Sequence, residues 1–429
     1  MDLIITFLGC ILFIIATYAL IPDLILHHLG LGTWKRQYSS GVALTFDDGP
    51  DPDFTPKVLK LLEDYKATAT FFVVGEKAQT YPYLIKEILA GGHQLGAHCQ
   101  HHENSLFMSP WRTWKEWNAG TKTIQELSGR EVTYIRPPWG SFNLALWVWC
   151  LAKRKRPVLW NSEGHDWLAH RSPETIASRI LRHVKEGSIV LLHDSGGEAG
   201  APENTLKALD LICQKILFEA KLPIVPLEFP DWSRLRRYFF ILWEKWEQLY
   251  ARLFLVQRIN STNFFRLATT RHKVPDLYTL DGELLAKKGD IVGEIHLDNI
   301  RFQSKCPNTR SIGLWALRQV RQSLPDLAKH ICENPVYENI RVFVGLTLLN
   351  RAATGLGFNV TTLPSSWSNR KAGAMQRLIM KVYQPSGTSD KKRSEQEPKL
   401  IWISKEDLLK KWLVTDKETQ IPLDQLETV

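Results

Sequence analysis

The chain has 429 residues, 23% of them charged, and a formal net charge of +9 at pH 7, which predicts two domains. Residues 1–230 carry 23 Lys and Arg against 24 Asp and Glu, whereas residues 231–429 carry 31 against 21. The six cysteines form no CxxC pair, which argues against a disulfide framework, and the basic second half has no basic–aromatic nucleic-acid motif, so no nucleic-acid partner is expected.

The N-terminus predicts a single transmembrane anchor over residues 1–30. Residues 3–21 contain no charge, and about twenty apolar residues are enough to cross a bilayer. A signal peptide would have a basic start, a shorter apolar core and a small-residue cleavage site, and none of these is clear. Lys35 and Arg36 follow the span. By the positive-inside rule they favour a cytoplasmic placement of the bulk of the chain, and so do the unpaired cysteines.

Residues 41–230 alternate apolar runs with amphipathic stretches of helical length. The predicted buried strands are VALTF at 42–46, TATFFVV at 68–74, HQLGAH at 93–98, RPVLW at 156–160 and SIVLLHD at 188–194. The predicted helices lie at 56–66, 81–92, 111–129, 172–187 and 203–221. This alternation predicts an α/β fold with a parallel sheet, open or closed into a barrel. Catalytic groups should then gather at the carboxyl ends of the strands.

The pattern changes in the second half of the chain. Residues 233–259 predict a long helix rich in aromatics and Arg, either a core helix or an interfacial helix against anionic lipid. Two strand-like runs then surround Gly289 and Asp290, and an apolar patch at 342–349 lies among further helices. Residues 384–399 are typical of a flexible loop, and a strand and a helix follow it. We therefore expect a second, smaller α+β domain.

The first and third predicted strands end in groups suited to metal binding. Asp47 and Asp48 are adjacent like charges, which repel unless a cation lies beside them. His98 and His102 are four residues apart, so on one helical turn they can face one metal ion. A carboxylate with two imidazoles leaves coordination positions open for water and substrate. Taken singly, Asp-Gly-Pro is an ordinary turn and most HxxxH pairs are incidental.

Three further motifs follow later strands. Arg136 precedes two prolines, so its backbone is stiff and extended. Its guanidinium is either held in place to pair with a carboxylate or that of an ordinary surface arginine. SEGHDW supplies Asp166 and Trp167, and VLLHD ends a very apolar strand in His193, a candidate general acid. Five such motifs at successive strand ends indicate one site.

The motifs TFDDGP, HCQHH, RPPWG, SEGHDW and LLHD resemble, in order and spacing, those of the polysaccharide deacetylase family (NodB homology domain, carbohydrate esterase family 4) over about residues 40–230. The resemblance implies a distorted (β/α)7-type barrel that hydrolyses N-acetyl or O-acetyl groups on a glycan, such as peptidoglycan or a chitin-like oligosaccharide. DGELLAKKGDIVGEIHLDN is similar to a YkoP-like domain of no established chemistry. The expected domains are the anchor (1–30), the catalytic domain (40–230), a linking amphipathic helix (231–259) and the YkoP-like domain (260–429).

The resemblance also implies the roles of the site residues. The expected ligands of a divalent metal, usually zinc, are Asp48, His98 and His102. The expected catalytic residues are Asp47 as the general base that activates water, Arg136 as its partner, His193 as the acid that protonates the leaving amine, and Asp166, which sets the charge and orientation of His193. The expected substrate-binding residues are Trp139, Trp167 and Leu191.

Three positions depart from the family pattern. Cys99 stands where Ser or Thr is usual, Glu163 where Asp is usual and Trp139 where Tyr is usual. No departure removes a ligand or a proton-transfer group, so activity is expected. Cys99 is expected to be a buried, inert thiol rather than an oxidation liability.

Two other functions remain open from the sequence, namely a glycan-binding scaffold on an inactive enzyme and a hydrolase of a small non-glycan amide. The expected partners are an acetylated glycan and a membrane, with no protein partner predicted. The family favours an extracytoplasmic catalytic domain, and this is preferred because the opposing charge bias rests on two residues. Glu294, His296 and Asp298 alternate on one predicted strand face, but are expected to be solvated or hydrogen-bonded rather than to form a second metal site.

Overall fold

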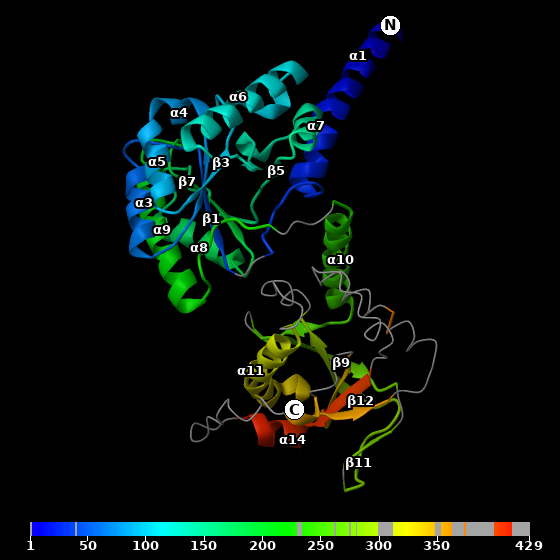
Figure 1. Ribbon diagram of the computed structural model, residues 1–429. Coiled ribbons are helices and arrows are strands. Elements are labelled where there is room, and N and C mark those ends of the chain that lie inside the picture. The colour runs from blue at the N-terminus through cyan, green and yellow to red at the C-terminus, as the bar shows by residue number, and fades with distance from the viewer. Residues whose placement is uncertain are drawn as a thin grey trace. The chain divides into compact units, whose positions relative to one another are not determined.

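The computed structural model describes residues 2–38, 41–229, 234–260, 263–273, 276–279, 281–298, 312–347, 353–362, 373–374 and 399–413. The chain divides into two compact units, Met1–Ser233 and Arg234–Val429 (Figure 1). The loop predicted at 384–399 lies outside the described residues except for Lys399. The finer domain boundaries stay a prediction.

The first unit begins with a long apolar helix. It runs without interruption through α1 (Asp2–Ile15), η1 (Ala16–Leu20), α2 (Ile21–Asp23) and η2 (Leu24–His28). Its 27 residues are long and apolar enough to cross a membrane, by length and composition. All of α1 is exposed and extends away from the unit (Figure 1). The second half of the helix packs on the unit and buries Ala19, Pro22 and Leu26.

Seven parallel strands form the sheet of the first unit. In spatial order they are β5 (Arg156–Pro157), β4 (Tyr134–Ile135), β3 (Gln94–Ala97), β2 (Thr70–Val73), β1 (Ala43–Asp47), β7 (Ile189–His193) and β6 (Ser162–Glu163). Within the described residues β5 and β6 form the two edges. The chain after the N-terminal helix extends the β5 edge, where the amide of Trp34 donates to the Pro157 carbonyl at 2.8 Å. The predicted fold with seven parallel strands is confirmed. Within the described residues the two edge strands do not pair with each other, so the distorted barrel is open.

The central strands explain the long apolar runs in the sequence. All five residues of β1 are buried, and so are the first four of β7, because a parallel sheet is covered by helices on both faces. The rings of Phe46 and Phe71 stack 5.0 Å apart in this core. Asp47 pairs in register with His193 of β7, so two groups far apart in sequence meet at the carboxyl edge of the sheet.

Helices connect these strands. They are α3 (Thr55–Asp64), α4 (Gly75–Thr80), α5 (Pro82–Ala90), α6 (Pro110–Ser128), α7 (Leu144–Ala152), α8 (Pro173–His183), α9 (Ala201–Gln214) and the continuing turn η5 (Lys215–Glu219), with short helices η3 (Ser105–Phe107) and η4 (Pro138–Gly140). The sequence reading missed α4 and α7. The residues of α7, LALWVWCLA, are apolar on every side and give no amphipathic pattern, but Asn143 caps the helix by accepting from the Leu146 amide.

The second unit combines helices with a mixed sheet. Within the described residues its helices are α10 (Arg234–Leu253), α11 (Ile312–Glu333) and α14 (Lys405–Trp412), with short helices η7 (Pro335–Tyr337) and η8 (Thr354–Leu356). Its main sheet has the order β14 (Asn359–Thr361), β15 (Lys399–Ser404), β13 (Val342–Thr347), β12 (Ile291–Leu297), β9 (Phe265–Arg271) and β8 (Gln257–Arg258), and β10 (Leu277–Tyr278) pairs with β11 (Leu284–Ala286). The predicted α+β character is confirmed.

The polar residues that alternate along β12 and at its end have charged protein side chains as partners. Asp298 pairs with Arg266 and lies 3.0 Å from Nε of Arg258, while His296 lies 3.7 Å from Glu294. Among the described residues, some groups of His, Cys, Asp and Glu lie close enough to share a metal ion. None of these groups includes Glu294, His296 or Asp298.

Candidate active site

The two adjacent aspartates occupy the end of β1. Asp47 is the last residue of the strand and is 3% exposed. Asp48 leaves the strand in the left-handed region, with φ of 71°, which Asp adopts more readily than most residues. This turn separates the two carboxylates and gives each a different set of neighbours.

Asp48 forms a compact cluster with the two predicted histidines. Its Oδ1 lies 3.2 Å from Nε2 of His98 and 2.8 Å from Nε2 of His102. One ligand atom from each residue lies within 4.8 Å of the others. Burial disfavours the charged form of Asp48, but hydrogen bonds with His102 and His98 outweigh it and hold the pKa of this carboxyl well below its usual range. At neutral pH the cluster therefore contains a carboxylate.

A second contact fixes which nitrogen of His98 faces the cluster. Nδ1 of His98 lies 2.7 Å from the Arg136 carbonyl oxygen. A carbonyl oxygen can only accept, so Nδ1 carries a proton, and Nε2 is the ring nitrogen turned toward Asp48. Metal-bound histidines are held in the same way by a partner on the other ring nitrogen. The three side chains therefore fit a divalent ion.

The prediction that His98 and His102 share a helical turn was wrong. Residues 98–102 form an irregular loop in which Cys99 and His102 have φ of 69° and 52°. The first amides of α4 hold this loop, because Gly75 donates to the Cys99 carbonyl at 3.0 Å and Glu76 donates to Gln100 at 2.9 Å. Helix N-termini carry such free donors. The pair therefore meets through a loop pinned by a helix that the sequence reading missed.

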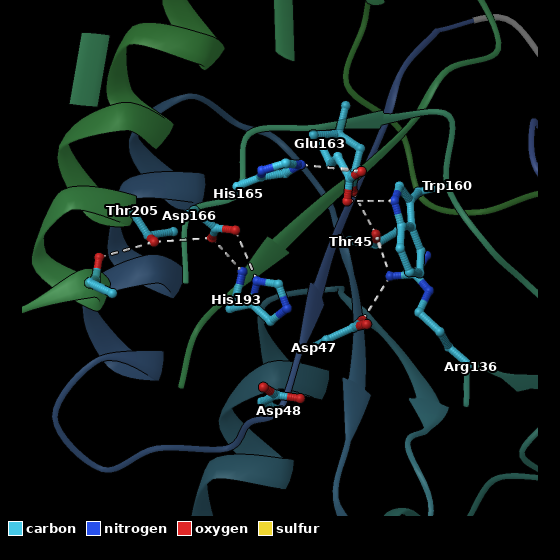
Figure 2. Close-up of polar contacts among 12 residues, drawn as sticks. Thr45, Asp47, Asp48, Arg136, Trp160, Glu163, His165, Asp166, His193 and Thr205 are labelled. Atoms are coloured by element: carbon cyan, nitrogen blue, oxygen red, sulfur yellow. Dashed lines mark hydrogen bonds and ion pairs between the residues drawn. The ribbon is translucent and has the colours of Figure 1, made fainter. Parts of the chain in front are cut away.

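Arg136 is a buried partner of Asp47, not a surface residue. The guanidinium is 0% exposed, and its Nη1 donates to Asp47 Oδ1 at 2.7 Å and to Thr45 Oγ1 at 2.8 Å (Figure 2). Its Nε donates to the Val158 carbonyl at 3.1 Å, and it lies 4.1 Å from the ring centre of Phe72. Arg136 therefore fixes one oxygen of the Asp47 carboxyl in place.

His193 and Asp166 form a second buried pair. Nδ1 of His193 lies 2.9 Å from Asp166 Oδ1, while Asp166 Oδ2 accepts from the His193 amide at 2.8 Å and from Thr205 Oγ1 at 3.0 Å (Figure 2). Burial favours the neutral imidazole, but the charge and hydrogen bond of Asp166, with the nearby Asp48 and Asp47, outweigh it and raise the pKa of His193 to about 9. Below that pH the imidazole is protonated and can donate from Nε2.

We expect Asp166→Asn to lower the pKa of His193 from about 9 toward its ordinary value of 6.5, because burial remains while the adjacent charge is lost. The measurement is an NMR titration of the histidine ring signals in metal-stripped protein. Glu163→Gln is the matched control, since in the described contacts Glu163 pairs with His165 and Trp160 rather than with His193. A His193 pKa that stays near 9 in Asp166→Asn would show that other groups stabilise the imidazolium.

The three predicted substrate-binding residues surround these groups. Trp139 is 59% exposed and its ring centre lies 4.8 Å from that of His102. The ring of Trp167 meets His193 edge-on at 5.4 Å. Leu191 is buried on β7, two residues before His193 and so on the same face of the strand. The structure thus brings the predicted residues to one edge of the sheet, and their roles stay predictions.

Glu163, the departure in the fourth motif, supports a neighbouring ring. Its Oε2 accepts from Trp160 Nε1 at 2.9 Å (Figure 2), and the Trp160 ring centre lies 5.6 Å from the Arg136 guanidinium carbon. Trp160 and Glu163 also line a cavity of about 390 Å³. Its lining also includes His27, Lys35, Arg179 and Arg182.

Sequence reasoning missed a supporting layer under the first motif. Asp194 is buried, and its Oδ2 accepts from Thr55 Oγ1 at 2.5 Å. Burial raises the pKa of Asp194 to about 7. A Cβ at Gly49 would lie 2.4 Å from the Asp194 oxygens, so the Gly in TFDDGP is needed for this close approach. Lys77 donates to the Asp48 carbonyl at 2.8 Å. The signal was Asp194, the last residue of LLHD, to which the sequence analysis gave no role.

Cys99 is buried and free, and burial raises the pKa of its thiol to about 11. We expect it to be unreactive toward Ellman's reagent at pH 8 in the folded protein, because the thiolate is the reactive form. Exposed Cys332 should react. The wild type and Cys99→Ser should give the same native thiol count and differ by one only after denaturation. A native difference of one would show an accessible thiol beside the cluster.

Two family models match the chain. The polysaccharide deacetylase model matches residues 35–150, and the YkoP domain model matches residues 236–412. The first model covers the motifs that contain the Asp48 cluster and Arg136.

Curated relatives match the first unit. A peptidoglycan-N-acetylglucosamine deacetylase of Bacillus cereus is 37% identical over 172 residues, which cover 39% of this chain and 80% of the relative. A chitooligosaccharide deacetylase of Azorhizobium caulinodans is 33% identical over 39% of this chain and 79% of the relative. The crystal structure of a peptidoglycan N-acetylglucosamine deacetylase matches with a TM-score of 0.43 and 30% identity, over 45% of this chain and 89% of that one.

Proposed function

Because the chain belongs to the polysaccharide deacetylase family, we propose that it is a metal-dependent enzyme that hydrolyses N-acetyl groups on peptidoglycan or on a chitin-like oligosaccharide. The observation that carries this proposal is the placement of two acid–base pairs beside one ligand cluster. Arg136 holds Asp47, Asp166 holds His193, and Asp48 forms the ligand cluster with two histidines. The names of the relatives support the choice of glycans.

Asp48, His98 and His102 would hold the metal, and zinc is the proposed ion because two imidazoles and a carboxylate suit it. When bound, such an ion polarises a carbonyl oxygen and lowers the pKa of water. The described residues supply the rest of the chemistry.

Asp47 is the proposed general base. It takes a proton from the water whose oxygen forms the new bond to the acetyl carbon. Its carboxylate is suited to this because Arg136 occupies Oδ1 at 2.7 Å, while Oδ2 points toward the cluster and lies 3.9 Å from His98 Nε2. The guanidinium fixes Oδ1 of Asp47 and so sets the direction of its free oxygen, Oδ2.

His193 is the proposed general acid. As the carbon–nitrogen bond breaks, Nε2 gives its proton to the leaving amine, so that acetate and a free amino sugar result. Asp166 holds Nδ1 at 2.9 Å, which aims Nε2 at the site and keeps the imidazole protonated at pH 7. Trp139 beside His102 offers an exposed ring on which a sugar can stack, and Trp167 and Leu191 would border the acetyl methyl.

The chain is further proposed to be anchored by its N-terminal helix, with the catalytic unit outside the cytoplasmic membrane where such glycans lie. An activity reporter fused after Arg36 would be active on one side of the membrane only and so tests this orientation. A reporter active only in the cytoplasm would contradict it.

The proposed activity is tested by acetate release from the full chain in detergent. The substrates are N-acetylglucosamine oligomers and intact peptidoglycan, each with added zinc and with chelator. Zinc-dependent acetate from at least one glycan is expected, and the rates rank the two. No acetate from either glycan, in protein that contains one metal per chain, would contradict the proposal and favour a small amide or a binding role.

A further inference from the structure

We propose that the catalytic unit docks on the lipid bilayer through an apolar collar around its N-terminal helix, so that the mouth of the active site lies at the membrane surface. The collar consists of Phe107, Trp111, Leu144, Val148 and Leu151. The inference extends the proposed function by naming the substrate class as acetylated glycan presented at the bilayer, for example while still joined to a lipid.

The second half of the N-terminal helix is a structural part of the catalytic unit. Leu26 is fully buried in the main core, and its carbonyl accepts from Thr33 Oγ1 at 2.8 Å. Asp23 Oδ1 accepts from the Phe142 amide at 2.9 Å, and Tyr18 donates to the Met108 carbonyl at 2.9 Å. Removal of this segment, as in a cleaved leader, would expose core residues. The helix is therefore suited to remain as an anchor.

The free part of the helix is too short to span a bilayer. Only α1, of 14 residues, is exposed on all sides, and at 1.5 Å per residue it measures about 21 Å. The hydrocarbon core is about 30 Å thick. A spanning helix must therefore place η1 in the bilayer as well. On its outer side the helix stays apolar through this region, with Leu20, Ile21 and Leu24 exposed.

The protein surface beside η1 is apolar, as contact with the hydrocarbon core of the bilayer requires. Helix α7 and the short helix η3 both pack against η1, and α7 lies beside the N-terminal helix in Figure 1. On α7 the exposed Leu144, Val148 and Leu151 share one face because they are spaced at i, i+4 and i+7. Phe107 and Trp111, beside the Met108 contact, are 87% and 81% exposed. Large apolar side chains so exposed mark an interaction surface.

The residues that follow α7 suit lipid headgroups. Lys153 and Arg154 are exposed directly after the helix, and basic residues near an anionic bilayer surface are attracted to it. Trp side chains such as Trp111 favour the interface between hydrocarbon and headgroups. The collar and the basic residues beside it thus combine the apolar, aromatic and charged groups that suit a bilayer interface.

This docking places the active site next to the membrane. A Cβ on Gly140, the residue after Trp139, would lie 3.1 Å from the His27 ring at the end of the N-terminal helix. Trp139 in turn contacts His102 of the ligand cluster. The rim of the substrate site therefore packs against the end of the N-terminal helix. Glycan at the lipid surface is then closer to the site than glycan far from the membrane.

The test measures the depth of the collar in a bilayer. The full chain, with Cys10, Cys306 and Cys332 changed to Ser, carries an environment-sensitive dye at Val148→Cys or, separately, at Trp111→Cys. It is reconstituted into nanodiscs that contain anionic lipid, with or without spin labels on the acyl chains. The matched control is Tyr83→Cys, an exposed position on α5, which lies across the unit from α7 (Figure 1). Acetate release in detergent confirms that each labelled variant is folded.

We expect the spin-labelled lipid to quench the dye at positions 148 and 111 at least about threefold more than the dye at position 83. Equal, weak quenching at all three positions would overturn the docking. The quenching is measured without substrate, so its failure is distinct from failure of the proposed deacetylation, which would appear as absent acetate from every variant, including the unlabelled chain.

Discussion

Changing Asp47 to asparagine is expected to lower kcat/KM for acetate release by about 10²–10⁴-fold, the contribution typical of a positioned general base. The amide keeps the shape of the side chain and can still contact Arg136, whose Nη1 lies 2.7 Å from Asp47 Oδ1 in the wild type. It cannot accept the proton from water. The measurement is steady-state acetate release from the better of the two glycans.

The control for this variant is its metal content. Asp47 is not one of the residues grouped as ligands, so Asp47→Asn should hold the same amount of zinc per chain as the wild type. Activity within tenfold of the wild type, at equal zinc content, would exclude Asp47 as the base. Loss of zinc together with activity would instead assign Asp47 to the metal.

Changing Asp48 to alanine is expected to abolish both bound metal and acetate release. The cluster loses its only carboxylate and keeps two imidazoles, His98 and His102. Even residues that contact metal ligands indirectly alter affinity by about 10–100-fold, so loss of a ligand should weaken binding at least about 100-fold. Metal per chain is measured after dialysis against micromolar zinc.

The matched control is Asp53→Ala, which removes an exposed carboxylate from the same loop. It should hold metal and release acetate like the wild type. If Asp48→Ala retained one metal per chain with unchanged affinity, the ion would have to bind elsewhere and the proposed ligand set would be wrong.

The sequence predicted the sheet and the site because both depend on strand ends. Parallel strands bring their carboxyl ends to one edge, so Asp47, His98 and His193 could be grouped without coordinates. The strands themselves were visible as apolar runs. Helix α7 was not, because its uniformly apolar residues carry no period.

The parts that the sequence could not predict are set by tertiary contacts. The loop from His98 to His102 takes its shape from the amides at the start of α4, and no pattern within the loop indicates this. The contacts of buried Arg136 with the rings of Phe72 and Trp160 also join distant segments. The role of Asp194 under Gly49 depends on a close approach across 145 residues of chain, which only a structure reveals.

Titration of metal into the stripped full chain, followed by acetate release, tests the central claim most directly. The account predicts no activity in the stripped protein, a linear rise with added zinc, and a plateau at one metal per chain. Asp48→Ala should stay inactive throughout. Full activity in protein shown to contain no metal, or no acetate from either glycan at one metal per chain, would contradict it.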